Sequence, residues 1–91
     1  MVTRKEIQPK VYAVLAAVSQ RPVSSLSDSQ TLRKDLLLGE ALIASLSVPW
    51  TKIASSYPGG LSVSWKESKA TTTVGNCVDL VTIKANGGKK P

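Results

Sequence analysis

The sequence has no histidine and no phenylalanine, and it has a single cysteine, Cys77. Without histidine, neither a Ser-His-Asp or Cys-His catalytic unit nor a histidine-rich metal site can form. One cysteine leaves no intramolecular disulfide and no Cys-x-x-Cys pair, so nothing indicates a disulfide-stapled secreted scaffold. These shortages favour a reducing compartment, and we expect a cytoplasmic protein.

Long hydrophobic runs are also missing. No apolar stretch approaches the roughly 20 residues that span a bilayer. Residues 1–10 are basic, but polar residues at helical spacing interrupt the apolar stretch that follows, which argues against a signal peptide. The 91 residues, of which 42% are hydrophobic, allow one small domain. We predict a single domain at 1–85 and, after the helix-breaking Asn-Gly-Gly at 86–88, a flexible tail at 86–91.

Acidic residues are scarce relative to basic ones. Six Asp and Glu face 12 Lys and Arg, for a formal net charge of +6. Such an excess serves solubility or attracts a polyanionic partner such as nucleic acid. The basic residues are spread along the chain without a block of five like charges, which favours the solubility interpretation.

The clearest pattern that is present is an apolar helix face near the N-terminus. Its members lie at i, i+4, i+7, i+8 and i+11: Ile7, Val11, Val14, Leu15 and Val18. Because proline is comfortable only in the first turn of a helix, Pro9 predicts a start near residues 5–7. Pro22 predicts that the helix ends before it.

The rest of the chain is less regular. Apolar spacing predicts helical segments at 40–48 and 49–56, with a break or kink at Pro49. After Pro58-Gly59-Gly60, the alternation of Leu, Val and Trp with serine at 61–65 is typical of a strand. A hairpin between this strand and the threonines at 71–73 is one interpretation. The spacing at 74–85 fits a helix face and a strand equally well.

Three stretches, in order, resemble the acyl carrier protein family. Residues 7–15 resemble the family's first-helix face, and residues 73–81 resemble the entry and body of its last helix. Residues 31–38 read Thr-Leu-Arg-Lys-Asp-Leu-Leu-Leu, similar to the family's Thr-Leu-x-x-Asp-Leu-Gly-Leu. The resemblance implies an all-α, four-helix bundle. A short β-hairpin or an irregular segment at 61–74 would replace the third helix.

The attachment site of that family is altered. In the family, a serine in an Asp-Ser-Leu motif carries 4′-phosphopantetheine, whose thiol holds acyl groups. Here Gly39-Glu40-Ala41 stands where that motif is expected, and Glu40 has no hydroxyl to form the phosphodiester. Ser45 lies five residues late and follows Ala44 rather than an aspartate. We therefore expect no prosthetic group and no cofactor.

The surface charge expected from the resemblance is also altered. The family's second helix is acidic and docks on basic partners, whereas this region carries Arg33, Lys34 and Lys52. We predict a non-catalytic protein-interaction module, with an enzyme of fatty-acid or polyketide metabolism as one kind of partner. The predicted partner-binding residues are Arg33, Lys34, Leu38, Glu40 and Lys52.

A winged-helix nucleic-acid-binding protein is the alternative. Helices at 7–19, 30–38 and 41–56 would precede a hairpin wing at 61–74, with Lys66 and Lys69 near phosphates. The weak point of this alternative is the third helix, because Lys52 is its single basic residue and Pro49 interrupts it.

An enzyme is the third possibility, and the sequence favours it least. The six acidic residues are scattered, and no histidine is available for general acid–base catalysis. Cys77 lies in an apolar stripe between Val74 and Val81, where a thiol packs as a small hydrophobe.

Overall fold

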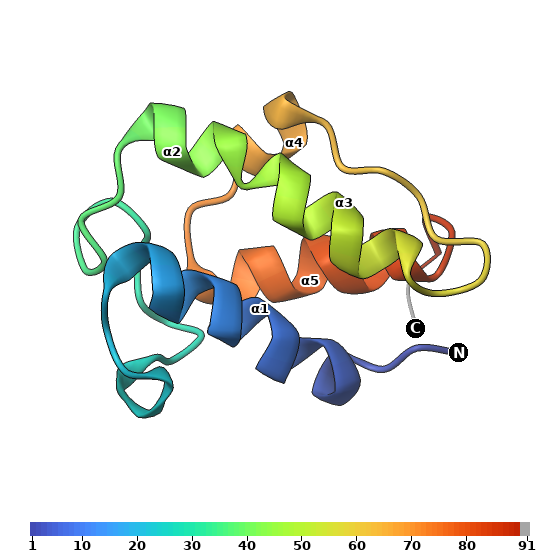
Figure 1. The fold of residues 1–91 in the computed structure, drawn as a ribbon, viewed down its shortest axis with the longest axis horizontal. Helices are drawn as coiled ribbons and strands as arrows, with labels where there is room; N and C mark the ends of the chain where they lie inside the picture. The colour runs from blue at the N-terminus through green and yellow to red at the C-terminus, as the bar shows by residue number, and fades with distance from the viewer. Residues whose placement is uncertain (90–91) are drawn as a thin grey trace.

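Apolar residues spaced three or four apart turn one face of each longer helix toward a shared core in the computed structural model, which describes residues 1–89. The helical elements, in chain order, are α1 (Arg4–Ser19), η1 (Val23–Ser25), α2 (Glu40–Ser45), α3 (Ser47–Ser55), α4 (Trp65–Lys69) and α5 (Val74–Ala85). α2 and α3 meet at Leu46 and follow one another as a bent rod (Figure 1). The predicted all-α, four-helix arrangement is confirmed.

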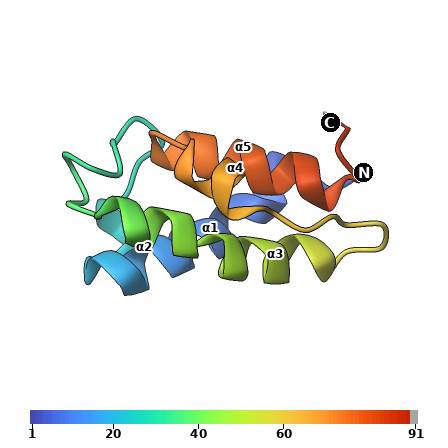
Figure 2. The same cartoon turned by 90° about the horizontal axis from the view of Figure 1, so that it is seen from above.

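The helices pack in three main pairs. α5 contacts both α1 and α3, and the short α4 lies against α2. α1 runs in the direction opposite to α3 and α5, so that both chain ends lie at one end of the bundle (Figure 1). The long connection from α1 to α2 covers the other end, and in Figure 2 α4 is seen between α2 and α5.

α1 follows the predicted pattern closely. Ile7, Val11 and Leu15 are fully buried. The helix begins at Arg4, one residue before the predicted range, because the Thr3 side chain accepts a hydrogen bond from the Glu6 amide and caps it.

The predicted break near Pro49 is present, but it falls at Leu46. Pro49 is the third residue of α3, where the missing N–H would have had no partner within the helix in any case. The proline therefore stands inside the first turn of a new helix instead of interrupting an old one.

The predicted strand at 61–65 and its hairpin are wrong. Among residues 1–89 the only β pairing is an isolated bridge between Thr31 and Thr73. Residues 61–64 are irregular, and α4 begins at Trp65 because Ser64 and Glu67 form a capping box, each side chain bonding the other's backbone N–H. The irregular alternative holds for residues 61–64 alone, because a short helix, α4, occupies part of the segment in which no third helix was expected.

The segment left open between helix and strand is helix α5. Thr73 and Asn76 form a second capping box at its N-terminus. The apolar stripe of this helix is fully buried, and its members are Val74, Cys77, Val78 and Val81. These buried residues are spaced three or four apart, as in a helix, and not at every second position, as in a strand.

Contacts with the rest of the fold continue past the C-terminal boundary predicted at residue 85. The Asn86 side chain accepts a hydrogen bond from the Val2 amide and donates one to the Val2 carbonyl, both at 2.8 Å. The Gly88 amide donates to the Ile83 carbonyl and helps to close the end of α5. The ordered contacts thus continue to residue 88, and residues 90–91 of the predicted tail lie outside the described residues.

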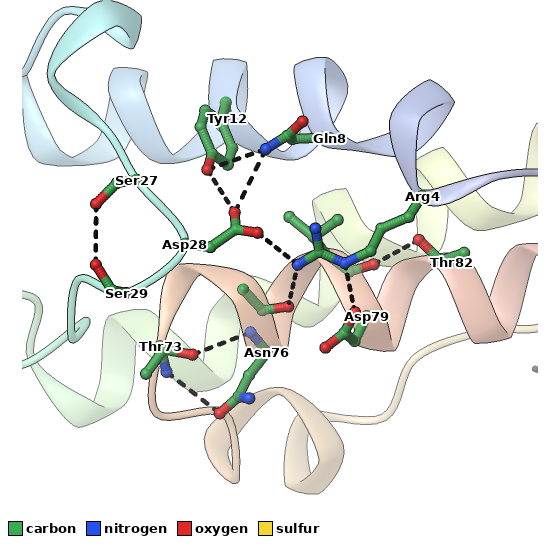
Figure 3. A network of polar contacts seen from close by, with 12 residues as sticks. Arg4, Gln8, Tyr12, Ser27, Asp28, Ser29, Thr73, Asn76, Asp79 and Thr82 are labelled. Atoms are coloured by element: carbon green, nitrogen blue, oxygen red, sulfur yellow. Dashed lines mark hydrogen bonds and ion pairs between the residues drawn. The ribbon is translucent and has the colours of Figure 1, made fainter.

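A polar cluster fastens α1 to α5 and to the long connection (Figure 3). The Arg4 guanidinium lies 2.6 Å from an Asp79 carboxylate oxygen and 2.8 Å from an Asp28 carboxylate oxygen. The Tyr12 hydroxyl donates a hydrogen bond to Asp28. This hydrogen bond and the Arg4 guanidinium hold the pKa of the Asp28 carboxyl below its ordinary value. The partners come from three segments, which indicates a structural role.

We expect Asp28→Asn to destabilise the protein by about 1 kcal/mol at pH 7, a modest value because water screens the half-exposed carboxylate. The folded-state pKa of Asp28 is lowered, so its contribution is present above its unfolded-state pKa of about 3.9 and is lost as the pH falls through the folded-state pKa. Urea unfolding of both proteins at pH 7 and pH 3 should show the difference shrinking at pH 3. Glu6→Gln, at an exposed acid in the first turn of α1, is the control. An equal difference at both pH values would contradict the assignment.

Candidate partner-binding surface

Glu40, which stands where the resemblance leads us to expect an attachment serine, is the first residue of α2. Gly39 caps the helix without a side-chain hydrogen bond, and the Glu40 side chain is 66% exposed. Its carboxylate stands at the positive end of the helix dipole, where a negative charge is favourable. The nearest basic group is Arg33, whose Nε lies 3.6 Å from a Glu40 carboxylate oxygen.

Arg33 is held on three sides. Besides its ion pair with Glu40, its guanidinium donates to the carbonyl of Lys69 at 3.3 Å and to that of Thr71 at 3.4 Å. These contacts join the connection before α2 to the segment between α4 and α5. Arg33 is thus chiefly a brace that keeps the start of α2 in place.

The other predicted contact residues divide into two groups. Lys34 and Lys52 are exposed, as a contact surface requires. Leu38 is only 5% exposed and belongs to the hydrophobic core, so its inclusion as a contact residue was wrong. Its amide donates to the Leu32 carbonyl at 2.9 Å, a bond that turns the side chain inward.

Three exposed apolar residues of this region were missed. Leu37 is 74% exposed, Val48 72% and Trp65 55%. Solvated large apolar side chains gathered on neighbouring elements mark interaction sites more often than isolated ones do. No sequence signal marked Leu37, because the leucines on either side of it are apolar as well and are buried, or Val48, because it shares an apolar pattern with the buried Ile43 and Leu46.

The elements that carry these residues are neighbours. The Ser68 hydroxyl in α4 donates to the Ile43 carbonyl in α2. The Thr51 hydroxyl in α3 bonds both the amide and the carbonyl of Val63, just before α4. α4 and the residues before it therefore lie beside both α2 and α3, and Figure 2 shows α4 next to this pair of helices. On these elements and on the preceding connection we select the exposed lysines and the three large apolar side chains that are more than half exposed, and call them the α2–α4 surface: Lys34, Leu37, Val48, Lys52, Trp65, Lys66 and Lys69.

The charge on the α2–α4 surface is positive. Its four lysines make no ion pair with an acidic residue among residues 1–89. Three acids of the region are engaged within the chain: Glu40 pairs with Arg33, Glu67 pairs with Lys84, and the exposed Asp35 accepts hydrogen bonds from the amide and hydroxyl of Thr31. The Lys84 ammonium, 2.7 Å from the Glu67 carboxylate, lowers the pKa of Glu67 and keeps it charged and paired at neutral pH.

Ser45, the displaced candidate for modification, is exposed at the end of α2. Its hydroxyl donates to the Leu42 carbonyl at 2.7 Å, within its own helix. It lies more than one helical turn beyond the start of α2, where Glu40 stands.

Other kinds of site find little support in residues 1–89. No group of three or more acidic or cysteine side chains is placed to hold a metal ion. No helix among these residues is long and apolar enough to cross a membrane. A solvent-open concavity of about 730 Å³ lies where the chain ends meet, next to Val2, Glu6 and Asn86, and none of the predicted site residues line it.

No protein-family model matches this chain, and comparisons with curated proteins and with solved structures found no match.

Cys77 is fully buried, and burial raises the pKa of its thiol to about 11. Because the thiolate is the reactive form, we expect the native protein to resist a thiol reagent such as DTNB at pH 8. The same protein in urea should react at the rate of an ordinary exposed thiol. Stoichiometric labelling of the native protein within seconds would contradict the packing of Cys77, and Cys77→Ala gives the background rate.

Proposed function

We propose that this protein is a carrier-like four-helix domain that has lost the carrier chemistry and acts through non-catalytic protein contacts. The observation that carries the proposal is the position of Glu40. The second helix begins at this residue, where the resemblance expects the modified serine, and a carboxylate paired with Arg33 stands there instead.

The order of elements supports the resemblance on which the proposal rests. A long first helix, a long connection, a second helix, a short third helix and a last helix are what the family implies, and α1, α2–α3, α4 and α5 follow that order. Fold similarity does not determine function. The altered attachment position and the altered surface charge are the features that argue for a changed role.

The proposed partner presents an acidic surface. The α2–α4 surface offers four unpaired lysines beside three exposed apolar side chains, and complementary charge speeds and orients association. An enzyme that recognises acidic carriers through basic residues would be repelled by this surface. An enzyme of fatty-acid or polyketide metabolism would therefore need an acidic docking site to be the partner.

The nucleic-acid alternative loses its main support. Its hairpin wing is replaced by an irregular segment and α4, and its third helix is divided at Leu46. The net charge of +6 alone predicts at most salt-sensitive, non-specific binding.

The loss of carrier chemistry is tested by intact-mass measurement after co-expression with a phosphopantetheinyl transferase. We expect no gain of the phosphopantetheine mass, because residue 40 has no hydroxyl and the Ser45 hydroxyl bonds within its helix. An acidic acyl carrier protein treated in the same way is the positive control. A mass gain in the wild-type protein would overturn the proposal, and Ser45→Ala would show whether Ser45 carries it.

A further inference from the structure

Leu37 combines two features that each cost stability. Its φ is +58°, in the left-handed region that a leucine rarely adopts, and its side chain is 74% exposed. Strained backbone persists where other contacts enforce it, and it concentrates at functional positions. Gln20 is the only other non-glycine residue with positive φ among residues 1–89, and it is a polar residue capping the end of α1.

The turn explains the backbone conformation but not the leucine. Leu36 and Leu38 are both buried, and the Leu36 and Leu38 amides donate to the carbonyls of Thr31 and Leu32. A left-handed residue between two inward-facing leucines directs its own side chain outward. Glycine or asparagine would adopt this conformation with less strain and would expose no apolar surface. The fold alone therefore gives no reason for a leucine at position 37.

The surroundings indicate what an exposed leucine here can contact. Lys34 is exposed three residues earlier, and Arg33 next to it ties this connection to Lys69. The two acids near Leu37 are engaged within the chain, Asp35 by hydrogen bonds from Thr31 and Glu40 by its ion pair with Arg33, so Lys34 is the unpaired charge beside the leucine. A single apolar side chain with basic neighbours complements an apolar pocket whose rim carries carboxylates. An anionic bilayer would also attract the lysines, but one leucine gives it little apolar area to bury.

We propose that Leu37 is the anchor of the α2–α4 surface and inserts into an apolar, carboxylate-rimmed pocket of a partner protein. This inference rests on the proposed function, because it names the contact through which the interaction module binds. It also assigns the strain at residue 37 to binding rather than to folding.

The first experiment measures the stability of the full chain. Leu37→Gly and Leu37→Asn relieve the left-handed strain and remove little buried surface, so the melting midpoint should rise by roughly 4–8 °C for Leu37→Gly and by less for Leu37→Asn. Val23→Ala, at another exposed apolar residue, is the matched control and should leave the midpoint nearly unchanged. A fall in the midpoint for both Leu37 variants would overturn the proposal, because Leu37 would then serve the fold.

The second experiment measures binding. A photoreactive benzoylphenylalanine is placed at residue 37, 48, 65 or 23 in cells that natively produce the protein, and any crosslinked protein is identified, purified and titrated with the wild-type chain. We expect the strongest adduct from residue 37, and a loss of affinity of about tenfold or more for Leu37→Gly. Lys34→Glu/Lys69→Glu should weaken binding much more than Lys5→Glu/Lys10→Glu on α1, although both pairs change the net charge equally.

The outcomes separate the inference from the proposed function. Adducts from residue 48 or 65 without one from residue 37, or a partner that binds Leu37→Gly as tightly as the wild type, would overturn the anchor and leave the interaction module standing. The absence of an adduct at every position would overturn both. Binding to vesicles containing anionic phosphatidylglycerol that is lost in Leu37→Gly, without a protein adduct, would overturn the pocket in favour of a membrane surface.

Discussion

The fold depends on a short backbone pairing between the long connection and the entrance to α5. The amides of Gly75 and Val74 donate to the carbonyls of Asp28 and Gln30, both at 3.0 Å, and the Leu32 amide donates to the Thr72 carbonyl at 2.9 Å. The first two donors belong to the opening turn of α5, which has no partners for them within the helix. The connection thus satisfies the helix end, and in return it is fixed in the register that buries Leu32.

The same backbone pairing, by fixing the long connection, also determines where the candidate site lies. A Cβ at residue 75 would lie 3.1 Å from the Asp28 carbonyl oxygen, so glycine permits the close approach. With the connection held there, Arg33 reaches the carbonyls before α5 as well as Glu40. The start of α2 is therefore positioned from outside the helix, by contacts with the chain that follows α4. A helix of six residues has little stability of its own, and such tertiary support is what fixes its first residue.

The sequence predicts best the helices whose apolar residues are buried at a regular spacing. It predicts worst the segments whose structure is decided by hydrogen bonds at a helix end. The spacing of Ile7, Val11 and Leu15 located α1, because a buried face recurs at helical spacing over about two turns. The alternation at 61–65 was misleading: only Val63 of its apolar residues is buried, and a Ser64-x-x-Glu67 capping box, visible in the sequence, decides the structure there. The exposure of Leu37 and the burial of Leu38 could not be predicted, since adjacent leucines differ only through a backbone angle set by distant contacts.

The surface of the protein is more basic than its net charge indicates. Arg4 engages two carboxylates, Asp28 and Asp79, while Glu40 and Glu67 each engage one basic group. Four of the six acidic residues are therefore held in ion pairs within the fold, and a single arginine accounts for two of them. Most of the lysines among residues 1–89 face solvent and form no ion pair with a carboxylate. The acidic residues are used in contacts that hold the bundle together, and the lysines give the surface a positive electrostatic potential. A partner therefore meets a more basic surface than the composition indicates.

Long-range attraction would bring an acidic partner to any side of such a molecule. The exposed apolar side chains of the α2–α4 surface are what would select one side for the contact itself.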